Sequence, residues 1–152
     1  MKWTLVAVLA AVAACGANSE TPEQRLIGTW VYANAADTSG LGVQFKGDST
    51  YELVIMQLTS STSANVEAET GVFSATDTEL TFVPQQWTCP GPYPSYTVSY
   101  HFNGDTLVVT SSTGATMLSR DTSPPWTNGY IAYGCFQSNG SFVAEALAPV
   151  SN

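Results

Sequence analysis

The most constraining feature of the chain is a succession of eight short, β-prone runs between residues 26 and 120, with no helical stretch of useful length between them. Val, Ile, Thr, Tyr and Phe recur in the runs, and Gly, Asn, Asp and Ser separate them. Such regular spacing is typical of a β-sandwich or a β-barrel. The predicted strands are Leu26–Ala33, Leu41–Lys46, Tyr51–Leu58, Asn65–Ser74, Glu79–Val83, Ser95–Phe102, Thr106–Ser111 and Thr116–Arg120.

Two short turns predict which of these strands pair. Each turn follows an aromatic residue with a Gly-Asp pair, at residues 45–48 and at residues 102–105. Alternating apolar runs flank both turns, which favours hairpins over loose loops. Asn103-Gly104 predicts a type I′ turn because both residue types tolerate positive φ. The second predicted strand should therefore pair with the third, and the sixth with the seventh.

The sixth run shows the clearest separation of two strand faces. From Tyr96 to Phe102 the even-numbered residues are apolar or aromatic and the odd-numbered residues are polar. This period of two predicts one buried and one solvated face. His101 falls on the polar face and is expected in solvent, without a chemical role. In the third run, residues 53–56 are apolar on both faces, so the C-terminal segment is expected to cover the outer face.

The N-terminal fifteen residues resemble a bacterial lipoprotein signal. Met1 and Lys2 precede an apolar run, and residues 12–15 read Val-Ala-Ala-Cys. The resemblance implies that residues 1–14 are removed, that Cys15 is lipidated, and that acyl chains anchor the protein to a membrane outside the cytoplasm. An ordinary secretory signal and a short membrane anchor are the alternatives, although the run is shorter than the about 20 apolar residues of a membrane span. An Asp directly after the lipidated cysteine is associated with retention in the inner membrane. This chain has Gly16 at that position, which favours the outer membrane.

A short polar tether and one helical turn follow the signal. Residues 16–20 are small and polar, and Thr21-Pro22-Glu23-Gln24 is typical of a helix start. Threonine suits the N-cap, proline the first helical position, and glutamine the third position of a capping box. Residues 15–25 are therefore predicted to form a lipidated tether with a short helical turn.

The charge of the chain excludes one class of partner. Without Lys2, the mature chain carries three basic side chains against 12 acidic ones, a formal net charge of −9. Binding to phosphates needs clustered Lys and Arg, so we expect no nucleic acid partner. Docking on anionic lipid headgroups through basic residues is disfavoured for the same reason.

The two remaining cysteines are predicted to form a disulfide. Cys89 and Cys135 would both lie outside the cytoplasm, where paired cysteines usually oxidise. Two free thiols are the alternative. With one histidine, and no second cysteine near either of these two, a metal site is not expected.

Aromatic residues gather around these cysteines. Residues 122–152 form an extension that is too aromatic to be disordered, and we expect it to pack on the barrel. The aromatic side chains fit either of two interpretations. They form the rim of a pocket for an apolar or sugar-like ligand, or they form a small second core between extension and barrel. The second interpretation is favoured. In the first case the contacting residues would be Tyr96, Tyr100, Trp87 and Trp126.

Gly28-Thr29-Trp30 follows the helical turn and opens the first strand, an arrangement that resembles the lipocalin superfamily. The resemblance implies an eight-stranded antiparallel up-and-down barrel, with Trp30 across its closed end and Arg120 stacked over Trp30. Gly-x-aromatic at residues 71–73 and Gly-Asp-Thr-Leu at residues 104–107 are similar to motifs of short bacterial lipocalin-like domains. The Thr-Asp-Tyr motif of typical lipocalins is absent and the strands are short, which disfavours a deep cavity. Such a barrel is either filled by side chains or holds one small ligand.

No constellation of residues indicates an enzyme. The chain has no Gly-x-Ser-x-Gly motif and no phosphate-binding loop, so neither catalysis nor a cofactor is expected. Glu67 and Glu69 lie two apart on one predicted strand and share a face. Paired carboxylates can cut glycosidic bonds, but a solvated strand face is the favoured interpretation.

These observations predict an all-β protein in four parts. Residues 1–14 are the signal, 15–25 the tether and helical turn, 26–121 a lipocalin-like barrel, and 122–152 an extension clamped by the disulfide. The expected function is non-enzymatic binding of a small apolar or amphipathic ligand by a lipoprotein of the outer membrane, on either its periplasmic face or the cell surface. A filled barrel that binds or inhibits an envelope protein is the alternative.

Overall fold

The computed structural model describes residues 20–34, 38–61, 63–121 and 130–144. The predicted signal, Cys15, and the greater part of the C-terminal extension lie outside these residues. One helix and ten strands are present in the described part of the chain. Their bounds are α1 Pro22–Leu26, β1 Gly28–Asn34, β2 Ser39–Phe45, β3 Thr50–Ser60, β4 Ser63–Ala75, β5 Glu79–Trp87, β6 Tyr96–Asn103, β7 Thr106–Ser111, β8 Gly114–Asp121, β9 Tyr130–Phe136 and β10 Phe142–Ala144.

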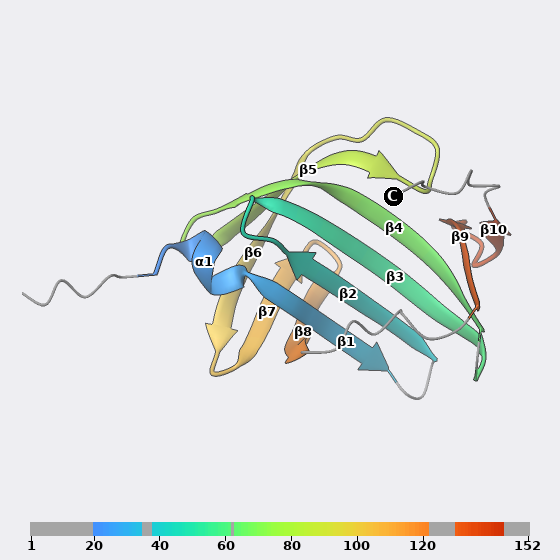
Figure 1. Ribbon diagram of the computed structural model, residues 1–152, viewed down its shortest axis with the longest axis horizontal. Coiled ribbons are helices and arrows are strands. Elements are labelled where there is room, and N and C mark those ends of the chain that lie inside the picture. The colour runs from blue at the N-terminus through green and yellow to red at the C-terminus, as the bar shows by residue number, and fades with distance from the viewer. Residues whose placement is uncertain (1–19, 35–37, 62, 122–129, 145–152) are drawn as a thin grey trace, which may run out of the picture.

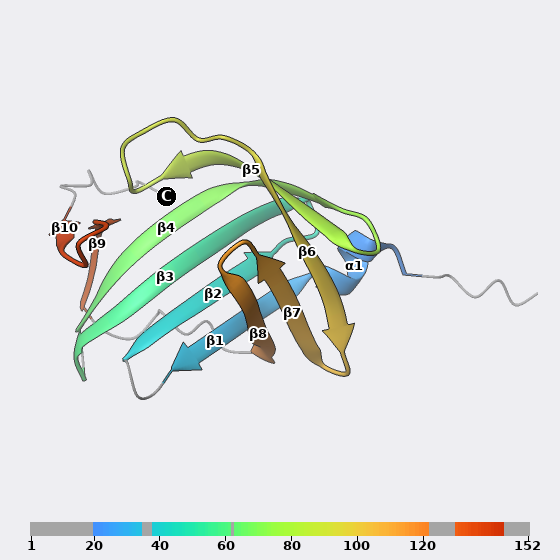
Figure 2. The same cartoon turned by 180° about the vertical axis from the view of Figure 1, so that it is seen from behind.

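Strands β1 to β8 form a closed antiparallel barrel in up-and-down order, as the sequence predicts. Each strand pairs with the next one along the chain, β1 also pairs with β8, and the second half of β4 pairs with β5. Helix α1 lies at the end of the barrel where β1 begins, which we call the closed end (Figures 1 and 2). The opposite end, where β3 turns into β4, is called the open end.

Both predicted hairpins are present. β2 pairs with β3 from Ser39 to Phe45, and β6 pairs with β7 from Ser99 to Asn103. The predicted type I′ turn is wrong, because among the turn residues only Gly104 has a positive φ, at 59°. Gly104 and Asp105 are the two loop residues, and positive φ at the first position alone is the requirement of a type II′ turn.

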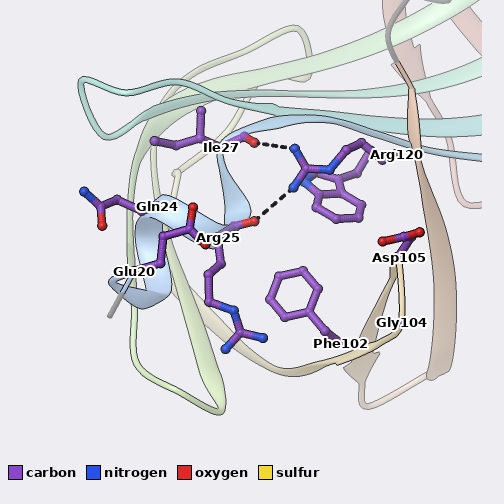
Figure 3. A pocket seen from close by; sticks show the side chains of 9 residues that line it. Glu20, Gln24, Arg25, Ile27, Phe102, Gly104, Asp105 and Arg120 are labelled. Atoms are coloured by element: carbon purple, nitrogen blue, oxygen red, sulfur yellow. Dashed lines mark hydrogen bonds between the residues drawn. The ribbon is translucent and has the colours of Figure 1, made fainter. Parts of the chain in front are cut away.

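Helix α1 and an arginine seal the closed end. Thr21 caps the helix and forms the predicted capping box with Gln24. The helix ends at Leu26, so the first strand begins at Gly28, two residues later than predicted. The Leu26 side chain is fully buried in the barrel core. The Arg120 guanidinium lies 4.5 Å from the ring centroid of Trp30. It also donates to the backbone carbonyls of Ile27 and Arg25, at 3.0 and 3.1 Å (Figure 3).

The half of the barrel next to α1 is filled by side chains. The ring of Phe82 packs against three others, with its centroid 4.8 Å from that of Tyr51, 5.0 Å from that of Tyr96 and 6.0 Å from that of Phe45. These contacts make this half a packed core. The buried residues of the cluster are Leu26, Trp30, Val43, Phe45, Tyr51, Phe73, Leu80, Phe82, Tyr100, Leu107 and Leu118.

Strand β5 is longer than predicted because its proline sits at a β-bulge. The predicted strand ends at Val83, just before Pro84, and proline cannot donate to a sheet ladder. In the structure, Gly71 of β4 pairs with Pro84 and Thr70 pairs with Gln86, so one extra residue of β5 bulges out. The bulge allows β5 to continue to Trp87.

The C-terminal segment adds two strands at the open end (Figures 1 and 2). β9 runs parallel to the first half of β4, beside residues 63–66, and β10 pairs with β9. Cys135 of β9 forms the predicted disulfide with Cys89, which follows β5. β5 and β9 thus approach each other end to end along β4, and the disulfide joins them.

The outer face of β3 and β4 carries a second apolar cluster. Val54, Ala64 and Val66 are buried there, with Met56 and Ala68 packed against them. The prediction that the C-terminal extension covers this face rests in part on residues 122–129 and 145–152, which lie outside the described ones, whereas β9 pairs with the edge of β4. No helix in the described residues is both long and apolar enough to cross a membrane.

Candidate functional site

A cavity of about 380 Å³ opens at the open end of the barrel. It is bounded by the inner faces of β2 to β5, by the start of β6 and by the loop before β6. We call it the mouth cavity. Its volume lies at the lower end of the range for small-molecule sites, about 300–1,000 Å³. The lining residues are Leu41, Leu53, Ile55, Glu67, Glu69, Pro84, Trp87, Pro94 and Tyr96.

Unequal strand lengths create this cavity. β3 and β4 have 11 and 13 residues, whereas β7 and β8 across the barrel have six and eight. The short strands supply core residues only near the closed end, so the inner face of the long strands continues beyond the core. Ile55 illustrates the consequence, because it points inward by the alternation of β3 and yet is 38% exposed.

Glu67 is buried in the wall of the cavity, with 7% of its surface exposed. The indole N–H of Trp87 donates to its Oε1 at 3.0 Å. The backbone N–H of Phe136 donates to its Oε2, also at 3.0 Å. Both oxygens are therefore satisfied by neutral donors, one from β5 and one from β9. A buried carboxylate at this point holds the ends of the two strands in place.

Glu69 is buried more deeply, with 5% of its surface exposed. Its Oε1 accepts hydrogen bonds from the hydroxyls of Tyr51 and Tyr96, the latter at 2.8 Å. Burial, reinforced by this carboxylate, raises the pKa of both tyrosines well above the ordinary value near 10, so both are neutral phenols at physiological pH. Packing against Phe82 orients the two phenols toward the carboxylate.

The favoured prediction that Glu67 and Glu69 form a solvated strand face is wrong. Both lie on the inner face of β4, the face that also carries Phe73 of the barrel core. The available signal was the period of two along β4, because Glu67, Glu69, Gly71 and Phe73 are each two residues apart and therefore share one face of the strand. Sequence reasoning missed it because acidic residues on strands are usually solvated.

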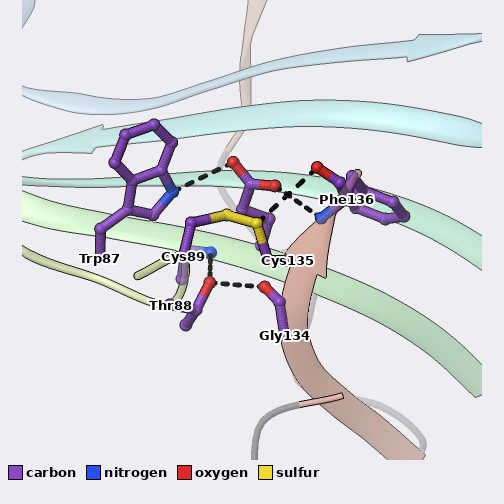
Figure 4. The surroundings of a disulfide bond; sticks show 8 residues. Trp87, Thr88, Cys89, Gly134, Cys135 and Phe136 are labelled. Carbon is purple, nitrogen blue, oxygen red and sulfur yellow. Dashed lines mark hydrogen bonds between the residues drawn. A yellow bond between two sulfur atoms is a disulfide. The ribbon is translucent and has the colours of Figure 1, made fainter. Parts of the chain in front are cut away.

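The disulfide and Thr88 hold the wall of the cavity together (Figure 4). Thr88 follows β5, and its backbone N–H donates to the carbonyl of Ala68 at 2.9 Å. Its side-chain hydroxyl accepts a hydrogen bond from the Ala68 N–H at 3.0 Å and donates one to the Gly134 carbonyl at 2.7 Å. Thr88 therefore bridges β4 and β9, next to the bond between Cys89 and Cys135.

The residues predicted to contact a ligand fall in different places. Trp87 and Tyr96 line the mouth cavity. Tyr100 is buried in the core and donates its hydroxyl proton to the Thr76 carbonyl at 2.7 Å, so it does not face the cavity. Trp126 lies outside the described residues. His101 is exposed on the outer face of β6, as predicted.

Two other features of the described residues are less suited to a ligand. Glu67 has a carboxylate oxygen within 4.8 Å of the sulfurs of Cys89 and Cys135, but the disulfide occupies these sulfurs. A more open groove of about 710 Å³ lies at the closed end, around Arg25 and Arg120 (Figure 3). Both guanidinium groups stack on aromatic rings of the barrel, which makes this groove part of the seal.

Comparison of the chain with protein-family models, with curated proteins and with solved structures found no match. The candidate site therefore depends on the geometry of the mouth cavity, and the lipocalin-like resemblance depends on the sequence motifs.

Proposed function

We propose that the protein binds a small apolar or amphipathic ligand in the mouth cavity without transforming it. The observation that carries the proposal is the cavity itself, which the barrel walls enclose on the side of β2 to β6 and which is lined mainly by apolar and aromatic side chains. Sites for small molecules share this composition, with a few polar groups that fix the orientation of the ligand. Here those groups are two carboxylates and one tyrosine hydroxyl.

The proposed setting is the bacterial envelope. The signal-like N-terminus supports cleavage before Cys15 and anchoring by its acyl chains to the outer membrane. The disulfide between Cys89 and Cys135 is consistent with an oxidising compartment. The lipocalin-like motifs at Trp30 and Arg120 support a place in that superfamily, whose barrels are suited to carrying small molecules.

Native mass spectrometry of residues 16–152, exported to the periplasm, tests ligand binding directly. This form contains every described helix and strand. We expect an adduct of constant extra mass that organic solvent removes. A bare protein mass, together with no thermal shift against a panel of lipids and small amphiphiles, would contradict the proposal and favour the alternative, a barrel that binds an envelope protein.

A further inference from the structure

We propose that the ligand of the mouth cavity carries a positively charged amino group on an apolar body, and that Glu69 binds this group. The inference rests on the proposed function and specifies its ligand class. It starts from an unusual combination, namely two carboxylates in the wall of an otherwise apolar cavity. Glu67 and Glu69 are each more than nine-tenths buried. As neighbours on one face of β4, their Cα atoms lie about 6.6 Å apart.

One oxygen of Glu69 remains available to a ligand. Both tyrosine hydroxyls donate to Oε1, and no group in the described residues donates to Oε2. Glu69 lines the mouth cavity, so the oxygen that accepts no hydrogen bond from the described residues is the one left for a ligand group.

The protein supplies no cation to this end of the barrel from its described residues. Arg25 and Arg120 lie at the closed end, where each stacks on an aromatic ring. Lys46 belongs to the turn between β2 and β3, which is also at the closed end. Buried carboxylates without a cationic partner are costly, because neutral hydrogen bonds replace only part of the lost hydration. A cationic group on the ligand would complete the site.

The rest of the wall favours an organic cation over a metal ion. Calcium prefers six to eight oxygen ligands, whereas the cavity offers few oxygens beside its leucines, prolines and aromatic rings. Trp87 and Tyr96 also present aromatic rings, which attract ammonium groups through cation–π interactions. Leu41, Leu53 and Ile55 suit an alkyl or aryl body. The geometry thus fits an amine-bearing amphiphile.

Three ligands with the same chain and different head groups test the inference. n-Octylammonium, n-octanol and n-octanoate are titrated into residues 16–152 by isothermal calorimetry at pH 7. We expect octylammonium to bind at least tenfold more tightly than octanol, and octanoate to bind most weakly. In Glu69→Gln this preference should fall below threefold, because the amide keeps the size of the side chain and its acceptor for the tyrosines but removes the charge.

A matched control and the contrary outcomes separate the two proposals. Glu79→Gln removes the same charge from an exposed position on β5 and should leave the preference unchanged. Octanol or octanoate binding as tightly as octylammonium, or an unchanged preference in Glu69→Gln, would overturn the cationic ligand while leaving a binding cavity. Absence of binding by all three would contradict the proposed function itself. The head-group series in the unmodified chain decides the question even if Glu69→Gln does not fold.

Discussion

Replacement of Gly71 by alanine should destabilise the barrel and disturb the mouth cavity together. The backbone at Gly71 does not have positive φ, so alanine meets no conformational penalty there. Its Cβ would however lie 2.9 Å from Pro84 Cα and 3.0 Å from Tyr51 Cε1, and closer still to the Val83 carbonyl oxygen. Two of these three atoms belong to the backbone of β5 at the bulge, so the strand itself has to move.

Overpacking of this kind typically costs about 1–3 kcal/mol, and we expect the upper part of that range because backbone cannot rotate away as a side chain can. For a domain of this size, each kcal/mol corresponds to a change of roughly 3–5 °C in the melting temperature. Gly71→Ala should therefore lower the melting temperature by about 6–15 °C. Because residues beyond the bulge carry Trp87 into the cavity, ligand affinity should fall as well.

Urea and thermal unfolding followed by far-ultraviolet circular dichroism measure this loss, with Gly47→Ala as the matched control. Gly47 also lacks positive φ, and its added Cβ would meet only the end of the Ile27 side chain at 4.0 Å. The control should change the free energy of unfolding by less than about 0.5 kcal/mol. Equal stability of the two variants would refute the reasoning that β5 touches β4 at Gly71.

Three further predictions concern the disulfide, the closed end and the two phenols that donate to Glu69. The double variant Cys89→Ser/Cys135→Ser opens a loop closed across 46 residues, and its free energy of unfolding in urea should fall by about 2–4 kcal/mol. Dithiothreitol should lower the free energy of unfolding of the unmodified protein to the same value. No change with the reductant would contradict the prediction. Arg120→Ala removes a stacked cation and two hydrogen bonds to backbone carbonyls, and should cost about 1–3 kcal/mol, with Arg120→Lys intermediate, as thermal unfolding will show. The raised pKa of Tyr51 and Tyr96 means that the fold favours the neutral phenols, so their contribution to stability is present below about pH 10 and is lost as the pH rises above it. Tyr51→Phe and Tyr96→Phe should accordingly leave the tyrosinate absorbance of the folded protein between pH 9 and 12 unchanged, but reduce that of the protein unfolded in guanidinium.

The sequence predicted the features that depend on local patterns. All eight barrel strands, both hairpins and the capping box at Thr21 follow from period-two alternation, turn residues and capping preferences. The disulfide between Cys89 and Cys135 follows from the number of cysteines outside the signal. These signals are local or compositional, so a single sequence contains them.

The candidate site depended on relations between strands that a single sequence does not display. The predicted end of β5 at Val83 is too early, because the bulge that lets the strand continue past Pro84 forms against Gly71 of β4. The burial of Glu69 depends on tyrosines 18 residues before it and 27 residues after it. The parallel pairing of β9 with β4 joins segments more than 60 residues apart. Each is a tertiary contact that overrides the usual preference of the residue type.

The division of the barrel into two halves explains how the fold can accommodate the buried carboxylates of Glu67 and Glu69. Aromatic and aliphatic packing is concentrated at the closed end, where the helix, Trp30 and Arg120 complete it. The open end contains two carboxylates, Glu67 and Glu69, that a purely apolar core would lack. Each accepts hydrogen bonds from neighbouring strands, Glu67 from β5 and β9 and Glu69 from β3 and β6. Departures from simple core rules concentrate where function has a use for them. A barrel needed only for stability would be expected to replace Glu69 and its two phenols by apolar side chains, which pack without desolvating a charge. The cost of burying Glu69 therefore favours the mouth cavity, rather than the sealed end, as the site of the proposed ligand.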